Sequence, residues 1–448
     1  MNAAPTRFSH ADATLRQIAE DMLRHARELG ASSAAVEVSE GFGQAVTVRQ
    51  REVETIEYTR DKGVSVSVFL GQRRGNASTS DFSPQALRET VAAALNIARY
   101  TAEDDCAGLP EATLQAREFP DFDIYHPWEL PVEQAIDLAQ RCEQAAFDAD
   151  RRIANSEGAT VNVNEAQFIY ADSNGFVGGY PTSRHSLSCA VIAGKGDAMQ
   201  RDYWYTVARA AGDLLDAEAV GRTAANRTVR RLKSRKLSTR QAPVLFEAPI
   251  AASLLNHFAH AASGGSLYRK SSFLLNQLGQ PVFSPSVRIS DDPTLRKGLG
   301  SGAFDEEGVR TQRRDVVADG VLQGYFLGSY SARKLGMQTT GNAGGTHNLI
   351  LQPGEHDLDG LLKQMGRGLL VTELLGQGVN YVTGDYSRGA AGFWVEDGVI
   401  QHPVEEITIA GNLKDMFRAI AAVGRDVLVQ GSRQTGSVLV EGMTVAGQ

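Results

Sequence analysis

The chain has 448 residues, of which 42% are hydrophobic and 22% charged, and both values are ordinary for a globular protein. At roughly 150 residues per domain, this length suggests about two or three domains. The net charge of -8 disfavours nucleic acid as the main partner. Glycine is abundant, at 45 residues, so many turns and close backbone contacts are expected.

The sequence indicates neither a targeting signal nor a membrane span. The N-terminus lacks the apolar core of a signal peptide, and the longest uncharged run, Ala248 to Tyr268, is too polar to cross a bilayer. Three cysteines, Cys106, Cys142 and Cys189, are far apart and lack CxxC spacing, which argues against a disulfide framework and a structural zinc site. We therefore expect a cytoplasmic protein.

The N-terminal half begins with a helix, a β-meander and a second helix. Apolar residues recur with helical spacing from Ala11 to Leu29, and Gly30 ends the pattern. The segment from Ala34 to Ser78 alternates between apolar and polar residues, which is typical of antiparallel strands. Ser83-Pro84 then opens a helix that continues to about Arg99.

The same order of elements occurs a second time. An acidic connection leads to a helix from Pro131 to about Asp148, then to more alternating sequence, then to a polar helix from about Ala217 to Leu232. This order favours an α+β fold over a doubly wound parallel sheet. We expect an N-terminal domain over residues 1–239, with sub-repeats 1–105 and 130–235 that either a duplication or chance would explain.

A basic segment, Arg227 to Arg240, closes this half of the chain. One interpretation is a contact for nucleic acid or an acidic partner. The other, which we favour, is a helix C-terminus whose cations complement the helix dipole before a polar linker. The second interpretation fits a domain boundary near residue 240.

The last part, residues 240–448, is predicted to be a β-rich domain. It begins with a strand and an apolar helix, and glycine-rich strand-and-turn sequence follows. Asp319-Gly320 and Asp397-Gly398 are typical of two-residue hairpin turns. Helical segments are predicted from Gly360 to Leu370 and from Asn412 to Ala422.

Two groups of polar residues in this domain are candidates for a substrate cleft. Tyr268, Arg269 and Lys270 follow the apolar helix, in a segment that could bind a peptide or equally be a solvated turn. The residues Gly384 to Gly392 are predicted to form a glycine-framed loop, and loops on rigid scaffolds often carry function. Its candidate residues are Asp385, Tyr386, Ser387 and Arg388.

His257 and His260 are the one close pair among the nine histidines. Residues three apart share a face of a helix, so both imidazoles could reach one metal ion. No glutamate lies between them as a general base, and spacing indicates no third ligand. Helix packing or a polar contact is the interpretation we favour for this pair.

Several long and specific segments resemble the TldD/PmbA family, and most closely its PmbA branch, also called TldE. They are SGGSLYRKSSFLLNQLG, GLGSGAFDEEGVRTQ, TGNAGGTHNL, GDYSRGAAGFWVEDG and PVEEITIAGNLKDM, all between residues 263 and 416. The resemblance implies a two-part α+β fold and a role in a cytoplasmic zinc metalloprotease built from a TldD-like and a PmbA-like subunit. It also implies processing of peptide antibiotics and degradation of small or unfolded proteins, and carries the older label "modulator of DNA gyrase".

This chain departs from the catalytic branch of the family at the metal site. That branch has His-Glu, three residues and a second His on the apolar helix, and a cysteine near the C-terminus. Aligned on Leu254-Leu255, the two histidine positions hold Asn256 and Ala261, His257 takes the place of the glutamate, and the cysteine position falls near Gln430. A zinc site with three protein ligands cannot be built from these residues.

We therefore expect a non-catalytic subunit without a metal or other cofactor, whose TldD-like partner supplies the zinc. A peptide or an unfolded protein would be the substrate, and a homodimer could form without the partner. One alternative is a self-sufficient metalloprotease that uses His257 and His260 with a distant third ligand. The other is a binding module for gyrase or nucleic acid, with Arg227 to Arg240 as the contact.

Overall fold

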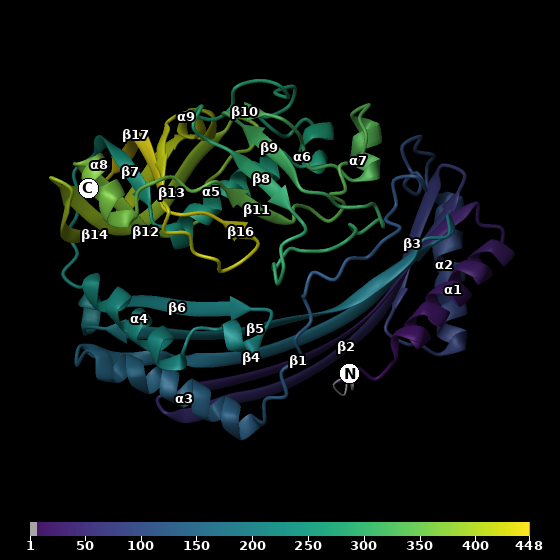
Figure 1. The fold of residues 1–448 in the computed structure, drawn as a ribbon, viewed down its shortest axis with the longest axis horizontal. Helices are drawn as coiled ribbons and strands as arrows, with labels where there is room; N and C mark the ends of the chain where they lie inside the picture. Colours follow the sequence, from purple (N-terminus) through teal and green to yellow (C-terminus); the bar gives the residue numbers. More distant parts are fainter. Residues whose placement is uncertain (1–6, 448) are drawn as a thin grey trace.

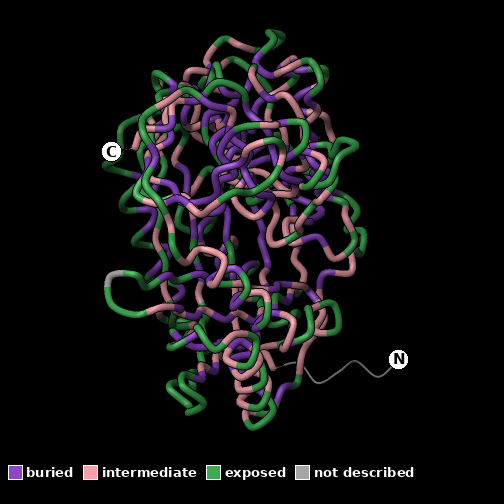
Figure 2. Tube along the Cα trace, turned by 90° about the vertical axis from the view of Figure 1, so that its left-hand side faces the viewer, coloured by how far each residue is buried: buried purple, intermediate pink, exposed green. Residues whose placement is uncertain are grey.

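The computed structural model describes residues 7–447, and these form two parts that face each other (Figure 1). The first part is a long, curved, six-stranded antiparallel sheet with four helices. The second contains a five-stranded and a six-stranded sheet with five shorter helices. The predicted α+β class is confirmed. Figure 2 shows that buried stretches of chain run through the interior of both parts.

The first part repeats the order helix, three strands, helix. Its first set is α1 (Asp12–Glu28), β1 (Ser33–Arg49), β2 (Glu52–Leu70), β3 (Arg73–Thr79) and α2 (Pro84–Tyr100). Its second set is α3 (Val132–Ala149), β4 (Ile153–Asp172), β5 (Val177–Ala193), β6 (Gln200–Ala208) and α4 (Ala217–Arg230), with short 3-10 helices at Gly196–Ala198 and Ala211–Asp213. The strand order β3-β2-β1-β4-β5-β6 places β1 and β4 at the centre, where they pair antiparallel.

The two helix pairs cover the same face of this sheet. In β1, Val36 and Val38 pack with α1 and α2, whereas Val46 and Val48 pack with α3 and α4. Side chains of a strand alternate between faces, so these even-numbered residues project from one face. Ala35, on the opposite face, belongs to a cluster with Phe304 of the second part. The second part therefore covers the face that the helices leave free (Figure 1).

The second part contains the largest hydrophobic core of the molecule. Its six-stranded sheet has the order β14-β13-β12-β7-β17-β15, and a further pairing of β14 with β17 closes five of these strands into a ring. The strands are β7 (Arg240–Phe246), β12 (Gly368–Leu375), β13 (Asp385–Glu396), β14 (Val399–Asn412), β15 (Ile420–Val423) and β17 (Val438–Ala446). The five-stranded sheet, in the order β10-β9-β8-β11-β16, contains β8 (Ile289–Asp292), β9 (Arg314–Ala318), β10 (Val321–Leu322), β11 (Asn348–Leu351) and β16 (Arg433–Gln434). The helices are α5 (Ala248–Ala261), α6 (Gly264–Tyr268), α7 (Ser329–Lys334), α8 (Leu358–Met365) and α9 (Leu413–Arg418).

The predicted hairpin turns are confirmed. Asp319 and Gly320 have φ values of 51° and 75° and join β9 to β10. Asp397 and Gly398, at 50° and 73°, join β13 to β14. Positive φ at both central residues is the requirement of a type I′ turn, and glycine meets it without a steric cost.

The two predicted C-terminal helical segments are too long. α8 ends at Met365, and Gly368 to Leu375 form strand β12. α9 ends at Arg418, and β15 starts at Ile420. In both cases the apolar run that continued the helical pattern is a strand, mostly buried in β12 and half-buried in β15, and periodicity alone does not distinguish such a run from helix.

The basic segment from Arg227 to Arg240 connects the two parts of the molecule. Arg227 and Arg230 of α4 each form an ion pair with Glu247, at 2.8 and 2.9 Å, and Glu247 immediately precedes α5. Arg231 pairs with Glu373 of β12. These arginines therefore bridge the two parts of the molecule as well as lying at a helix C-terminus. The proposed contact with nucleic acid loses three of its seven cations to these ion pairs.

No disulfide links the cysteines of the described chain: Cys142 and Cys189 are buried thiols, and Cys106 is half-buried. Over residues 7–447, no helix has both the length and the apolar character that crossing a bilayer requires.

Candidate functional site

Helix α5 presents two polar side chains to the space between the two parts of the molecule. The helix begins after Glu247 with Pro249 in its first turn, where a missing N–H costs nothing. Most of its residues are buried in the core, but Asn256 and His260, one turn apart, are exposed. Both line one cavity of about 660 Å³.

Asn256 also lines a second cavity, of about 640 Å³. Arg433 of β16 is the other residue that both cavities share. The first cavity extends toward Tyr268 and the second toward Arg388 and Gln430. The two cavities thus meet at the position where the first metal ligand of the catalytic branch would lie.

His257 points into the core rather than into these cavities. It is 6% exposed, and its Nδ1 lies 2.9 Å from the hydroxyl of Tyr381. Burial is the main cause that lowers the pKa of His257 to about 4, and Arg388 and His260 lower it further. The ring of His260 packs against the same Tyr381, at 4.0 Å between centroids. Both histidines therefore contact Tyr381, His257 through a polar contact and His260 through ring packing, as expected for the helix-packing interpretation.

The residues at the metal-ligand positions do not fit a zinc ion. Ala261 has no accessible surface and offers only a methyl group. Asn256 and Gln430 offer neutral amides, and the Gln430 amide donates to the backbone oxygen of Tyr205 at 2.7 Å. Structural and catalytic zinc sites use histidine, cysteine and carboxylate ligands. Nothing at these three positions supplies one.

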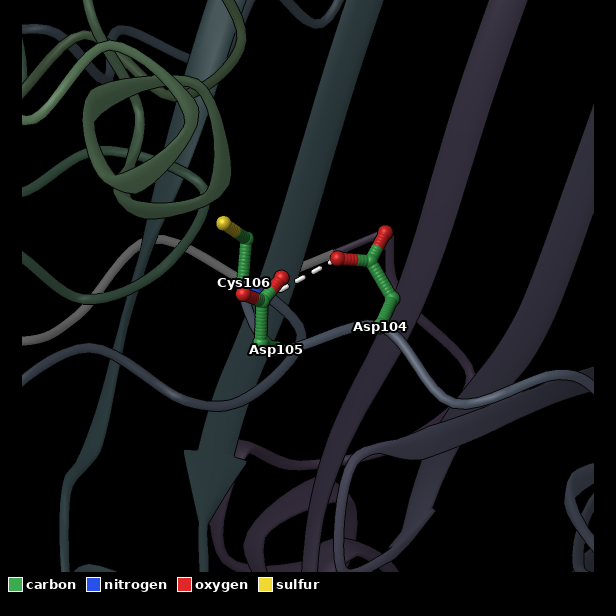
Figure 3. A group of neighbouring side chains, drawn as sticks. All are labelled: Asp104, Asp105 and Cys106. Atoms are coloured by element: carbon green, nitrogen blue, oxygen red, sulfur yellow. Dashed lines mark hydrogen bonds between the residues drawn. The ribbon is translucent and has the colours of Figure 1, made fainter.

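One group of three potential metal-binding side chains occurs within the described chain, and it lies elsewhere. Asp104, Asp105 and Cys106 are consecutive residues of the connection between α2 and α3 (Figure 3). Asp104 already accepts hydrogen bonds from Lys334 at 2.8 Å and Tyr330 at 2.7 Å. These bonds, that of Lys334 first, lower the pKa of Asp104 to about 2. We interpret this carboxylate as a structural link to α7.

The first predicted group of cleft residues is divided between the cavity and the surface. Tyr268, at the end of α6, lines the first cavity. Arg269 is exposed and stacks on the Tyr268 ring, with 5.2 Å between its guanidinium carbon and the ring centroid. Lys270 is exposed in a left-handed conformation, with φ of 57°. Neither cation lies among the residues that form the two cavities described above.

The predicted loop from Gly384 to Gly392 is wrong, because residues from Asp385 onward form strand β13. This strand pairs with β12 on one side and β14 on the other. A Cβ atom on Gly392 would lie 1.9 Å from the backbone oxygen of Leu370. This glycine therefore permits close packing of strands and does not mark a loop.

The residues of this strand differ in exposure. Arg388 lines the second cavity. Tyr386 is 1% exposed and packs edge-on against the His257 ring, so it supports the site from within the core. Asp385 is exposed and bonds to Thr383, and Ser387 is exposed as well. The structure thus brings Arg388 and Tyr268 to connected cavities, and leaves Asp385 outside them.

Sequence reasoning missed several residues of these cavities. Arg184 of β5 and Arg433 of β16 line the second cavity, and Tyr381 packs against both histidines. Arg184 and Arg433 are far apart along the chain and lie in no motif. They line one cavity only because the two parts of the molecule pack against each other.

Family models match almost the whole chain. The PmbA/TldA metallopeptidase domain 1 matches residues 34–98, the central domain matches residues 125–232, and the C-terminal domain matches residues 239–447. Metalloprotease PmbA from Escherichia coli O157:H7 is 50% identical over 97% of both chains. A metalloprotease PmbA homolog from Haemophilus influenzae is 49% identical over 97% of this chain and 96% of its own.

The chain belongs to the PmbA branch of the TldD/PmbA family. This confirms the resemblance found in the sequence. A TldD homolog from Haemophilus influenzae is more distant, at 25% identity over 81% of this chain and 79% of its own. The relatives named above carry the name metalloprotease, so the chain is a protein of a metalloprotease family.

Solved structures share the fold. A candidate modulator of DNA gyrase from Bacteroides thetaiotaomicron is 28% identical, covers 98% of this chain and 100% of its own, and has a TM-score of 0.93. TldE from Thermococcus kodakarensis is 18% identical, covers 96% of this chain and 100% of its own, and has a TM-score of 0.82. At this identity the likeness is one of fold.

Proposed function

We propose that this PmbA-branch chain is the non-catalytic subunit of a cytoplasmic zinc metalloprotease complex of the TldD/TldE type, which degrades or processes peptides and small unfolded proteins. One observation carries the proposal: the ligand positions hold Asn256, Ala261 and Gln430, and none of these can replace a histidine or a cysteine at zinc. A TldD-like partner would supply the zinc ion, the general base and the nucleophilic water.

The contribution of this chain would be to shape the substrate cleft. The cavities that meet at Asn256 are lined by residues from both parts of the molecule, including Tyr205, Tyr268 and Arg388. Each cavity exceeds 600 Å³, a size that suits several residues of an extended peptide. Backbone groups and aromatic walls would bind peptides with little dependence on sequence.

The alternatives have weaker support. In a self-sufficient metalloprotease, His257 would have to leave its bond to Tyr381 and turn out of the core. In a module that binds DNA, the segment Arg227 to Arg240 would have to give up ion pairs with Glu247 and Glu373.

A peptidase assay of the purified chain alone, and of the chain with a TldD-like partner, tests the proposal. We expect activity only in the mixture. Activity should persist after His257→Ala and His260→Ala in this chain and disappear when the partner's metal-binding histidines are replaced. Elemental analysis should find no stoichiometric zinc in the chain alone. About one zinc per isolated chain, removed by His257→Ala, would overturn the proposal in favour of the self-sufficient enzyme.

A further inference from the structure

The cavity of about 640 Å³ beside α5 is rich in arginine. Its wall includes Arg184 from β5, Arg227 from α4, Arg388 from β13 and Arg433 from β16. Two carboxylates, those of Asp202 and Glu373, lie in the same wall. Four cations therefore face two anions, and the cations come from both parts of the molecule.

Both carboxylates already form ion pairs, with Arg227 of this wall or with Arg231, which directly follows α4. Asp202 lies 3.4 Å from Arg227 and 3.8 Å from Arg231, and Glu373 pairs with Arg231. Among the described side chains, no carboxylate forms an ion pair with Arg184, Arg388 or Arg433. Arg184 is exposed to solvent, and Asp291 favours the charge of Arg433 without pairing with it. Arg388 and Arg433 therefore line the cavity without a direct counter-ion.

Buried polar atoms without partners are concentrated in the same wall. In the described part of the chain, the Nε atoms of Arg388 and Arg433 and the hydroxyls of Ser253 and Thr372 are buried and make no hydrogen bond. The Arg433 guanidinium donates to the hydroxyl of Ser432 at 2.7 Å, which leaves most of its donors unused. Buried donors without an acceptor are costly, and burial lowers the pKa of Arg433 accordingly.

A ligand carboxylate would resolve this imbalance. A carboxylate accepts two parallel hydrogen bonds from a guanidinium, and arginine suits such planar, bidentate contacts. The hydroxyls of Ser253 and Thr372 could donate to the same group. Apolar and aromatic side chains complete the wall, among them Trp204, Ile250 and Leu374, and could contact the chain that carries the carboxylate.

We propose that this cavity binds a carboxylate of the peptide substrate, with Arg388 and Arg433 as its main donors. Either the C-terminal carboxylate or an acidic side chain would provide the group. The rest of the peptide would pass Asn256 into the neighbouring cavity, because the two cavities share that residue and Arg433. This inference rests on the proposed function, since it names the chemistry of the substrate that the subunit receives.

Calorimetry with the full chain tests the inference. The probes are an N-acetylated ten-residue glycine–serine peptide with a free C-terminus, the same peptide as its C-terminal amide, and that amide with one central glutamate. We expect the free acid to bind about ten- to hundred-fold more tightly than the amide, as the loss of one charge-assisted hydrogen bond implies. Recovery of affinity by the glutamate peptide would assign the site to carboxylates in general, and no recovery would restrict it to the C-terminus.

Variants separate binding from folding. With Arg388→Ala, Arg433→Ala or both, the affinity for the free-acid peptide should fall to that for the amide. Arg388→Lys should keep part of the preference for the free acid. Arg269→Ala is the matched control, because this arginine is exposed and outside both cavities. Equal binding of acid and amide by the unmodified chain would overturn the inference without any variant. A preference that survives the double substitution would also overturn it.

The complex provides the final readout. The kcat/KM of the chain with its TldD-like partner should show the same preference for the free acid, and Arg388→Ala should remove it. If the complex cleaves acid and amide equally well, the carboxylate site is wrong and the subunit role stands. If this chain leaves the partner's activity unchanged, the proposed function itself fails.

Discussion

At the scale of single residues, the lowered pKa of His257 should make the stability of the protein depend on pH. Its pKa is about 4 in the folded protein and about 6.5 in an unfolded chain. Between these values the unfolded state binds more protons than the folded state. The contribution of His257 to the free energy of unfolding is therefore fully present above about pH 6.5 and is lost as the pH falls to about 4. A shift of this size corresponds to a loss on the order of 3 kcal/mol.

Urea unfolding between pH 7.5 and 4 checks this expectation. His257→Gln should lower stability at pH 7.5 and flatten the decline at lower pH, because the titrating group is gone. His356→Gln is the control, since His356 is exposed and is not among the groups that shift the pKa of His257, so the decline should stay unchanged. A parallel decline in the His257 variant and the unmodified chain would show that other groups cause it.

Some residues of the site could be predicted and others could not. The absence of ligand-type side chains at Asn256, Ala261 and Gln430 follows from the sequence once the register is set. The environment of His257 depends on Tyr381, which lies 124 residues away. No local pattern encodes such a contact, because the closeness of the two residues is a property of the folded core.

At the scale of elements, the contact between α4 and α5 depends on buried charge. Arg227 and Glu247 are 8% and 7% exposed and lie 2.8 Å apart. Removing Glu247 leaves the buried Arg227 with only the more distant Asp202, at 3.4 Å, and breaking a buried pair costs up to about 3–5 kcal/mol. We therefore expect Glu247→Ala to destabilise the protein by about this amount in urea unfolding at neutral pH.

A surface pair provides the comparison. Arg201 and Glu157 lie 2.6 Å apart but are 48% and 41% exposed. Such pairs contribute about 0–1 kcal/mol, so Glu157→Ala should change stability little. Equal effects of Glu157→Ala and Glu247→Ala would contradict the role that we give to the buried pair between the two parts.

The elements that were predictable have local causes. Helix α1 follows from its apolar spacing, and the Asp-Gly turns follow from the backbone conformation that glycine allows. Strand β13 was missed because Gly384 and Gly392 suggested a glycine-framed loop. The function of Gly392 is steric: Leu370 of the preceding strand β12 approaches it closely, and the spacing of the glycines does not reveal that contact.

At the scale of the whole molecule, the order of elements predicted the α+β class but not how the two parts meet. Alternation from Ala34 to Ser78 indicated antiparallel strands, and in the structure helices bury one face of the sheet that contains them. The second face is covered by residues such as Ala303 and Phe304, from a segment more than 90 residues beyond the last strand of the sheet. The arginine-lined cavity exists only because of this arrangement.

The N-terminal sheet leaves one edge unpaired, on which exposed Ile56 and Tyr58 lie among charged residues, and we expect the isolated chain to associate through it. Within residues 7–447, β3 pairs with Val64–Leu70 of β2, and no strand pairs with the outer edge of β2 before that point. Ile56 and Tyr58 on this stretch are 45% and 58% exposed. Unpaired edges bind other chains, and two identical edges can pair by a two-fold axis.

Light scattering at micromolar concentration checks the association. A homodimer gives twice the chain mass of 48.2 kDa, and replacing both Ile56 and Tyr58 with lysine should shift the protein toward the monomer, because charge at an edge opposes pairing. Tyr100→Lys is the control, since Tyr100 is 84% exposed on α2, away from this edge. A clean monomer of the unmodified chain would contradict self-association. A dimer that persists in the double variant would place the interface elsewhere on the molecule.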